Sequence, residues 1–167
     1  MVSRLKRGVV SSVAEPGSGS FSGAREPAPQ PELLVRNEWE DNDPDRKRAL
    51  LVAEHTVFRQ ALALLIEWHM DFKTAQAGSL NEARRIFGKP AAEPDLVVVD
   101  LELRYGDGFV LTGELRRAKP DVPVLALTIS QNPERAARAK EAGAGEVLTK
   151  AASSEELLEG VRLLGNG

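Results

Sequence analysis

Four polar residues of different chemical types come at the ends of four apolar runs of the chain. They are Glu54, Asp100, Thr128 and Lys150. Two carboxylates, a hydroxyl and an ammonium group, if gathered in one place, would suit an oxygen-loving divalent cation together with an anion such as a phosphoryl group. One polar residue at the end of a strand is commonly only a structural cap. Four successive ones, each of a different kind, favour a functional site.

The apolar runs that precede these residues predict strands. Continuous apolar runs, typical of strands buried on both faces, cover residues 49–52, 96–99 and 122–128. Pro123 lacks a backbone N–H donor, but it lies near the start of the run 122–128, where the missing hydrogen bond matters least. Shorter strands are predicted over residues 72–76 and 146–149.

Apolar residues at helical spacing predict a helix after each strand. Residues with good capping chemistry mark three of the starts, at Ser79, Asn132 and Ser153, and Gly143 supplies a stop. Another helix ends at Lys119, before a proline. In the first helix the recurring apolar residues are Val57, Leu62, Leu64, Leu65 and Trp68.

Alternation of strands and helices requires a parallel sheet covered on both faces by right-handed crossovers. We therefore expect an α/β, doubly wound domain over residues 47–167. Ligands of open parallel sheets bind beyond the carboxyl ends of the strands. The polar residues that end the apolar runs fall at that edge, so the architecture predicts that they meet.

Residues 1–46 differ in composition from the rest of the chain. They are dense in Ser, Gly and Pro and end in an acidic cluster, so they bury too little apolar surface to offset the entropy of ordering. We expect a disordered or linker-like arm. The apolar group formed by residues 33–35 and Trp39 leaves a second interpretation open, a short segment that docks onto this domain or onto a partner.

Composition excludes several classes of protein. The formal net charge of −3 gives no reason to expect an electrostatic grip on nucleic acid. With no cysteine, disulfides, zinc–thiolate sites and thiol nucleophiles are excluded. No apolar run approaches the roughly 20 residues of a membrane helix, and the N-terminus makes a poor signal peptide. These features predict a cytoplasmic protein without direct contact to membrane or nucleic acid.

A family resemblance rests on four segments taken together: LLVAEHTVFRQALALLIE, VVVDLEL, VLALT and EAGAGEVLTKAASSEELLEGVRLL. They resemble the first strand and helix, the strand with the phospho-accepting aspartate, the fourth strand and the closing segment of response-regulator receiver domains. The likeness spans about residues 47–165. It is closest to receivers that precede a helix-turn-helix output, the LuxR-type (NarL/FixJ) group. It implies a flavodoxin-like sheet in the order 2-1-3-4-5.

The resemblance also implies roles for the polar residues. Asp100 would accept a phosphoryl group from a phosphohistidine of a partner histidine kinase or phosphotransfer protein. Mg²⁺ would be held by Asp100, by the carboxylate of Glu54 and by the backbone carbonyl of Glu102. Lys150 would pair with the phosphoryl group, and Thr128 would hydrogen-bond it. Such a domain is a signalling module with at most self-phosphorylation and self-dephosphorylation activity, not a conventional enzyme.

Several positions depart from the family pattern. Ala53 stands where the family has one of two adjacent acids, and this loss predicts weaker Mg²⁺ binding. Ile129 replaces a small residue and could crowd the approach to Asp100. Val147 replaces an aromatic switch residue. Residues 103–104 read Leu-Arg in place of Met-Pro, and Ala151 replaces a proline.

Two hypotheses remain open from the sequence. One is an atypical receiver phosphorylated on Asp100, and the other is a phosphorylation-independent pseudoreceiver that serves as a protein-interaction module. An enzyme with another doubly wound fold has little support, because neither a glycine-rich phosphate loop nor a nucleophile elbow is found. The chain ends directly after its last helix, so we expect the output to run through protein contacts, either homodimerisation by the last two helices or docking to a separate partner.

Overall fold

The computed structural model describes residues 45–89, 93–104 and 107–166. In this part of the chain, five parallel strands form a sheet in the order β2-β1-β3-β4-β5. The strands are β1 (Lys47–Val52), β2 (Phe72–Ala77), β3 (Leu96–Asp100), β4 (Val124–Thr128) and β5 (Glu146–Thr149). The helices are α1 (Thr56–His69), α2 (Leu80–Phe87), α3 (Asp107–Ala118), α4 (Pro133–Ala142) and α5 (Ser154–Gly165). The predicted fold class and strand order are confirmed.

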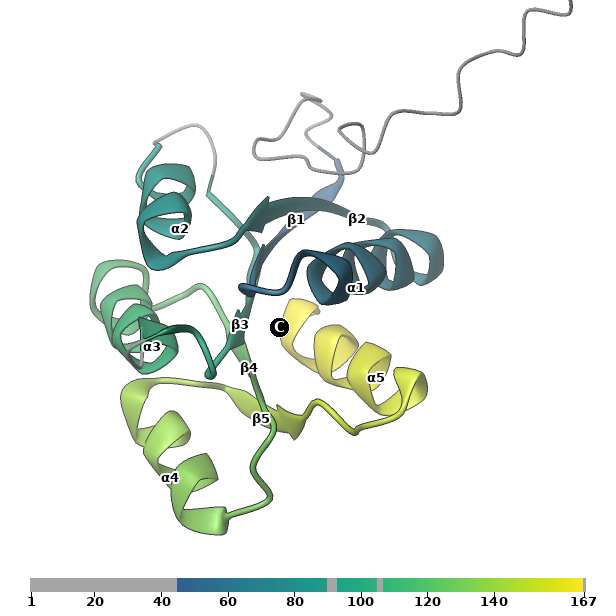
Figure 1. Ribbon diagram of the computed structural model, residues 1–167. Helices are drawn as coiled ribbons and strands as arrows, with labels where there is room; N and C mark the ends of the chain where they lie inside the picture. The colour runs from purple at the N-terminus through teal and green to yellow at the C-terminus, as the bar shows by residue number, and fades with distance from the viewer. Residues whose placement is uncertain (1–44, 90–92, 105–106, 167) are drawn as a thin grey trace, which may run out of the picture.

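The helices cover the sheet on both sides (Figure 1). Helices α1 and α5 lie on one face, and α2, α3 and α4 lie on the other. Successive side chains of a strand point to opposite faces. In β1, Leu50 and Val52 therefore join the core under α2 and α3, whereas Ala49 and Leu51 join the core under α1 and α5. This double burial explains why the central strands are continuous apolar runs in the sequence.

Local capping chemistry sets the helix ends where the sequence predicts them. Ser79 accepts a hydrogen bond from the N–H of Glu82 at 3.3 Å. Asn132 does the same for Glu134 at 2.9 Å, directly before Pro133. Ser153 forms a full capping box at the start of α5. Helix α4 ends at Gly143, whose φ of 121° is one that side chains rarely adopt.

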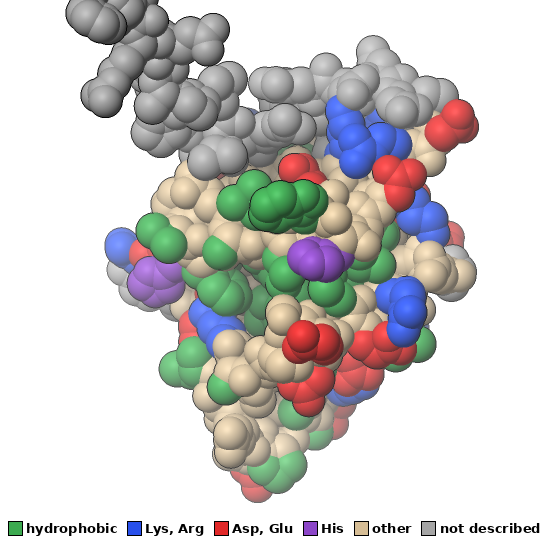
Figure 2. Space-filling model, turned by 90° about the vertical axis from the view of Figure 1, so that its right-hand side faces the viewer, with side chains coloured by type: hydrophobic (Ala, Val, Ile, Leu, Met, Phe, Trp, Pro, Cys, Tyr) green, Lys and Arg blue, Asp and Glu red, His purple; other side chains and the backbone are tan. Residues whose placement is uncertain are grey.

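The buried face of α1 differs from the apolar spacing seen in the sequence. Its buried residues are Arg59, Leu62, Ala63 and Ile66. Val57, Leu64 and Trp68 are exposed, with Trp68 at 86%. The helix turns this way because Leu62, Ala63 and Ile66 pack with α5 and the sheet. Figure 2 shows hydrophobic side chains at the surface on the side of the molecule that α1 and α5 cover.

The expected N-terminal arm lies outside the described residues except for Asp45 and Arg46. Arg46 pairs with Asp71 at 2.8 Å, which ties the chain to the domain just before β1. Among the helices that the structure describes, none has both the length and the apolar character needed to cross a bilayer.

Candidate functional site

Asp100 ends β3 and pairs with Lys150, which directly follows β5. Lys150 Nζ lies 2.5 Å from Asp100 Oδ2. The other oxygen, Oδ1, accepts the backbone N–H of Glu102 at 2.9 Å. Asp100 is only 1% exposed. A buried carboxylate needs such partners, because removing a charge from water without compensation is costly.

Thr128 ends β4, the strand next to β3, and its hydroxyl donates to a carboxylate that is not Asp100. The acceptor is Glu102 Oε1, at 3.1 Å. The second oxygen of Glu102, Oε2, accepts the N–H of Ile129 at 3.1 Å. The Glu102 side chain therefore connects the loop that follows Asp100 to the end of β4.

Arg135, in the first turn of α4, forms an ion pair with the carboxylate of Glu102. Its Nη2 is 2.9 Å from Glu102 Oε1, and its Nε donates to the Thr128 hydroxyl at 3.3 Å. The guanidinium also lies 5.1 Å from the ring centre of Phe109 in α3. One arginine thus connects the loop after β3, the end of β4 and helices α3 and α4.

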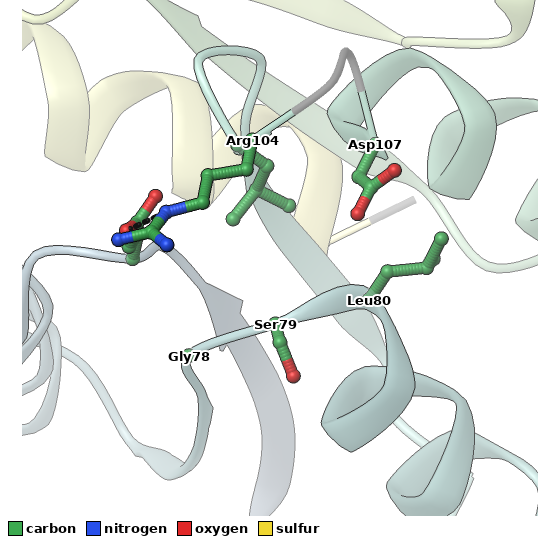
Figure 3. Close-up of a pocket in the computed structure, with 7 residues that line it drawn as sticks. Gly78, Ser79, Leu80, Arg104 and Asp107 are labelled. Atoms are coloured by element: carbon green, nitrogen blue, oxygen red, sulfur yellow. Dashed lines mark hydrogen bonds and ion pairs between the residues drawn. The ribbon is translucent and has the colours of Figure 1, made fainter.

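Glu54 is paired with a different arginine. Arg104 Nε lies 2.5 Å from Glu54 Oε1, and the Arg104 side chain is mostly exposed. The pair borders a pocket of about 310 Å³ that Ser79, Leu80 and Asp107 also line. In Figure 3, Arg104 reaches across the pocket to the carboxylate with which it pairs, while Asp107 lies on the other side of the same opening.

Buried Arg59 holds the loop that carries Glu54. Its Nη1 donates to the carbonyl oxygens of Ala53 and of Glu54, the latter at 3.3 Å. Burial lowers the pKa of the Arg59 guanidinium, and the charge of nearby Glu82 opposes that effect. The arginine lies on the buried face of α1 and holds the β1–α1 loop in place through these two carbonyl groups.

The sequence-predicted residues reach the same edge of the sheet but do not all touch. Asp100 and Lys150 are in direct contact. Thr128 is linked to the loop after Asp100 through Glu102. Glu54 pairs with Arg104 and not with any of the other three.

Sequence reasoning missed three features of this edge: the side chain of Glu102, Arg104 and Arg135. Glu102 was singled out only for its backbone carbonyl. An acid two residues after a candidate nucleophile was a usable signal, since its side chain starts from the same loop. Nothing local marks the two arginines, because each meets its partner only in the folded chain.

Both carboxylates of the predicted magnesium site are paired with cationic side chains in this structure. Among the described residues, no group of three or more acidic, histidine or cysteine side chains is placed to hold a metal. Glu54 is already neutralised by Arg104, and Asp100 by Lys150. Mg²⁺ requires near-ideal octahedral oxygen coordination, so a cation would have to displace Arg104 first.

The fold and this edge define the class: doubly wound α/β domains with a buried aspartate at the carboxyl ends of the strands. Residues 49–162 match the response regulator receiver domain family. Because the match covers more than half of the chain, the protein belongs to this family, whose members are receiver domains of two-component signalling systems.

Curated relatives are bacterial regulatory proteins. The chain is 33% identical over 121 residues to the DNA-binding transcriptional activator DevR/DosR of Mycobacterium tuberculosis, covering 72% of this chain and 55% of that protein. It is 31% identical over 120 residues to the methanol utilization control regulatory protein MoxX of Paracoccus denitrificans, covering 71% and 53%. The chain therefore spans about half the length of these curated relatives.

A solved structure also supports the assignment to the response regulators. A two-component response regulator of the LuxR family from Aurantimonas sp. SI85-9A1 superimposes with a TM-score of 0.67 at 30% identity, covering 73% of this chain and 86% of that one. The Francisella response regulator 1452 receiver domain, at 24% identity and a TM-score of 0.66, agrees in fold.

Proposed function

We propose that this receiver accepts a phosphoryl group on Asp100 from a histidine kinase or phosphotransfer protein and signals through protein contacts. The observation that carries the proposal is the buried pair of Asp100 and Lys150 at the carboxyl edge of the sheet. Phosphoryl transfer to aspartate requires a nucleophilic carboxylate beside an ammonium group, together with a cation that shares the charge of the equatorial oxygens.

In the proposed step, one Asp100 oxygen forms a bond to phosphorus. The bond from phosphorus to the histidine nitrogen breaks, and that nitrogen leaves with the electron pair. Negative charge gathers on the equatorial oxygens during transfer. Lys150, already 2.5 Å from Asp100 Oδ2, is placed to offset that charge. The proposed site residues are thus Asp100, Lys150 and Thr128.

Exposed apolar side chains next to the site support a protein partner. Val57, in the first turn of α1, is 80% exposed, and Ile129, after β4, is 70% exposed. Both belong to segments at the carboxyl edge of the sheet, so a docking protein would bury them as it reached Asp100. Homodimerisation through α4 and α5 would use a different surface. Leu163 in α5 is an exposed apolar residue that such a dimer could bury.

A second candidate function is a pseudoreceiver that acts by binding without phosphorylation. Two contacts favour it. Arg104 neutralises Glu54, and Glu102 takes the hydrogen bonds of Thr128 and Ile129. The first contact makes Glu54 less available to a cation, and the second makes the donors of Thr128 and Ile129 less available to a phosphoryl group. For this reason we propose an atypical receiver.

Intact mass spectrometry separates these functions. The protein is incubated with Mg²⁺ and acetyl phosphate, a small donor that needs no kinase. We expect a single phosphoryl adduct on the native chain and none on Asp100→Asn. Asp95→Asn is the matched control, because Asp95 lies at the opposite end of β3 and should leave the adduct unchanged.

Each outcome decides between the candidates. An adduct that survives Asp100→Asn would mean that another residue is the acceptor. No adduct on the native chain, together with none on Glu102→Ala, which frees the Thr128 hydroxyl and the Ile129 N–H, would leave the pseudoreceiver as the function.

A further inference from the structure

The carboxylate of Glu102 accepts hydrogen bonds from the donors that an anion bound next to Asp100 would use. It accepts the Thr128 hydroxyl at 3.1 Å and the Ile129 N–H at 3.1 Å. Arg135 adds a charge-assisted bond at 2.9 Å. All of these donors lie at the end of β4 or the start of α4, beside the strand that ends in Asp100. A phosphoryl group on Asp100 would need the same donors.

We propose that Glu102 is a built-in anion that occupies the phosphoryl donors in the unmodified chain and is displaced when Asp100 is phosphorylated. The inference rests on the proposed function and adds its regulation. Charge supplies the reason for displacement. A phosphoryl group carries about −1.5 to −2 at neutral pH, and a partly buried carboxylate that shares its donors would repel it.

Displacement of Glu102 would change α4 through Arg135. This guanidinium contacts Glu102, the Thr128 hydroxyl and the Phe109 ring, so it joins α4 to the site and to α3. When Glu102 leaves, Arg135 loses its carboxylate and becomes available to the phosphoryl oxygens. The first turn of α4 would then report the state of Asp100. This gives the chain a transmission route although Val147 replaces the aromatic switch residue.

The first test measures how fast acetyl phosphate modifies Asp100. An Asp100 oxygen bonds to phosphorus while the bond from phosphorus to the acetyl oxygen breaks and acetate leaves. Glu102→Ala frees the donors, so we expect adduct to form about tenfold faster than on the native chain, as expected for the loss of one charge-assisted competitor. Glu102→Gln keeps the size of the side chain without its charge and should also be faster than native.

Glu146→Ala is the matched control, because it removes the same charge from a half-exposed acid at the start of β5. Its rate should equal the native rate. Circular dichroism and melting temperature verify that each variant is folded. An adduct on Glu102→Ala with none on the native chain would support the inference in its strongest form, with Glu102 as the block.

A second readout needs no phosphorylation. The amide proton of Ile129 donates to Glu102, so its NMR signal should move upfield in Glu102→Ala and stay in place in Glu146→Ala. An unmoved Ile129 signal would overturn the inference directly.

A third measurement tests the route to α4 by hydrogen exchange over residues 133–142. Phosphorylation of the native chain should alter exchange in the first turn by about fivefold, the effect of one ordinary hydrogen bond. Arg135→Ala should abolish that response. Arg138→Ala should keep it, because Arg138 lies over the same Phe109 ring, 4.7 Å from its centre, without a hydrogen bond to Glu102 among the described contacts.

The failures are distinguishable. Equal or slower modification of Glu102→Ala, with adduct still formed on Asp100, overturns the inference and leaves the proposed function standing. No adduct on the native chain and none on Glu102→Ala or Glu102→Gln defeats the proposed function, and the inference with it.

Discussion

Two arginines control the negative charges at the edge of the sheet. Arg104 neutralises Glu54 from the loop after β3, and Arg135 neutralises Glu102 from α4. Asp100 has a lysine instead. Each of the three carboxylates thus has its own cationic side chain, with which a metal ion would have to compete. The Glu54 pair is the most exposed of the three and should be the easiest to open.

Removing Arg104 should therefore strengthen magnesium binding. Exposed ion pairs contribute roughly 0.2–1 kcal/mol, so Arg104→Ala should raise Mg²⁺ affinity by about 1.4- to fivefold. The measurement is an NMR titration with magnesium chloride that follows the amide signals of Glu54 and Asp100.

Arg162→Ala is the control for that titration. It removes an arginine of similar exposure, paired with Glu159 in α5 and far along the chain from the site. Affinity that does not change in Arg104→Ala would show that Arg104 and the cation do not compete.

At the scale of elements, α3 begins directly against the strand that carries Asp100. A Cβ atom on Gly108 would lie 2.4 Å from the Asp100 carbonyl oxygen and 2.7 Å from Cα of Leu101. Both neighbours are backbone atoms, which cannot move aside as a flexible side chain can. Helix α3 can pack at this depth only because residue 108 is glycine.

Gly108→Ala should therefore destabilise the fold although alanine is the better helix former. Overpacking of a tight contact costs roughly 1–3 kcal/mol, which urea unfolding should show as a lower midpoint at unchanged slope. Gly113→Ala, in the same helix, is the matched control. Its added Cβ meets nothing closer than 3.9 Å, so stability should rise by about 0.5–1 kcal/mol. Equal effects of the two substitutions would contradict the close packing of α3.

For the whole molecule, the described strands and helices build two main cores by themselves, one on each face of the sheet. We propose that residues 47–167 form the stable domain and that residues 1–46 are a linker-like arm.

Deleting residues 1–44 should leave the melting temperature within about 3 °C of the full chain, the shift that corresponds to roughly 0.5 kcal/mol. Deletion of residues 1–46 also removes the Arg46–Asp71 pair, a surface contact expected to add little. Calorimetry of the three proteins makes the comparison. A drop well beyond this range on deleting residues 1–44 would show that the apolar group at residues 33–35 and Trp39 docks onto the domain.

Local patterns in the sequence predict the strands, most helix ends and the strand edge at which the polar residues meet. These features depend on signals that act locally: continuous apolar runs, capping side chains such as Ser153, and the stop at Gly143. A parallel sheet then places residues that end successive strands along one edge, so the meeting of Asp100 and Lys150 could be predicted without coordinates.

The buried face of α1 and the cationic partner of each carboxylate depend on tertiary packing and could not be predicted from local sequence. The apolar spacing of α1 was ambiguous, and packing against α5 and the sheet selected Ile66 over Trp68. Glu102 and Arg135 are 33 residues apart, and Glu54 and Arg104 are 50 apart. Contacts at such separations carry no local signal, because they exist only after the crossovers have brought the loops to one edge.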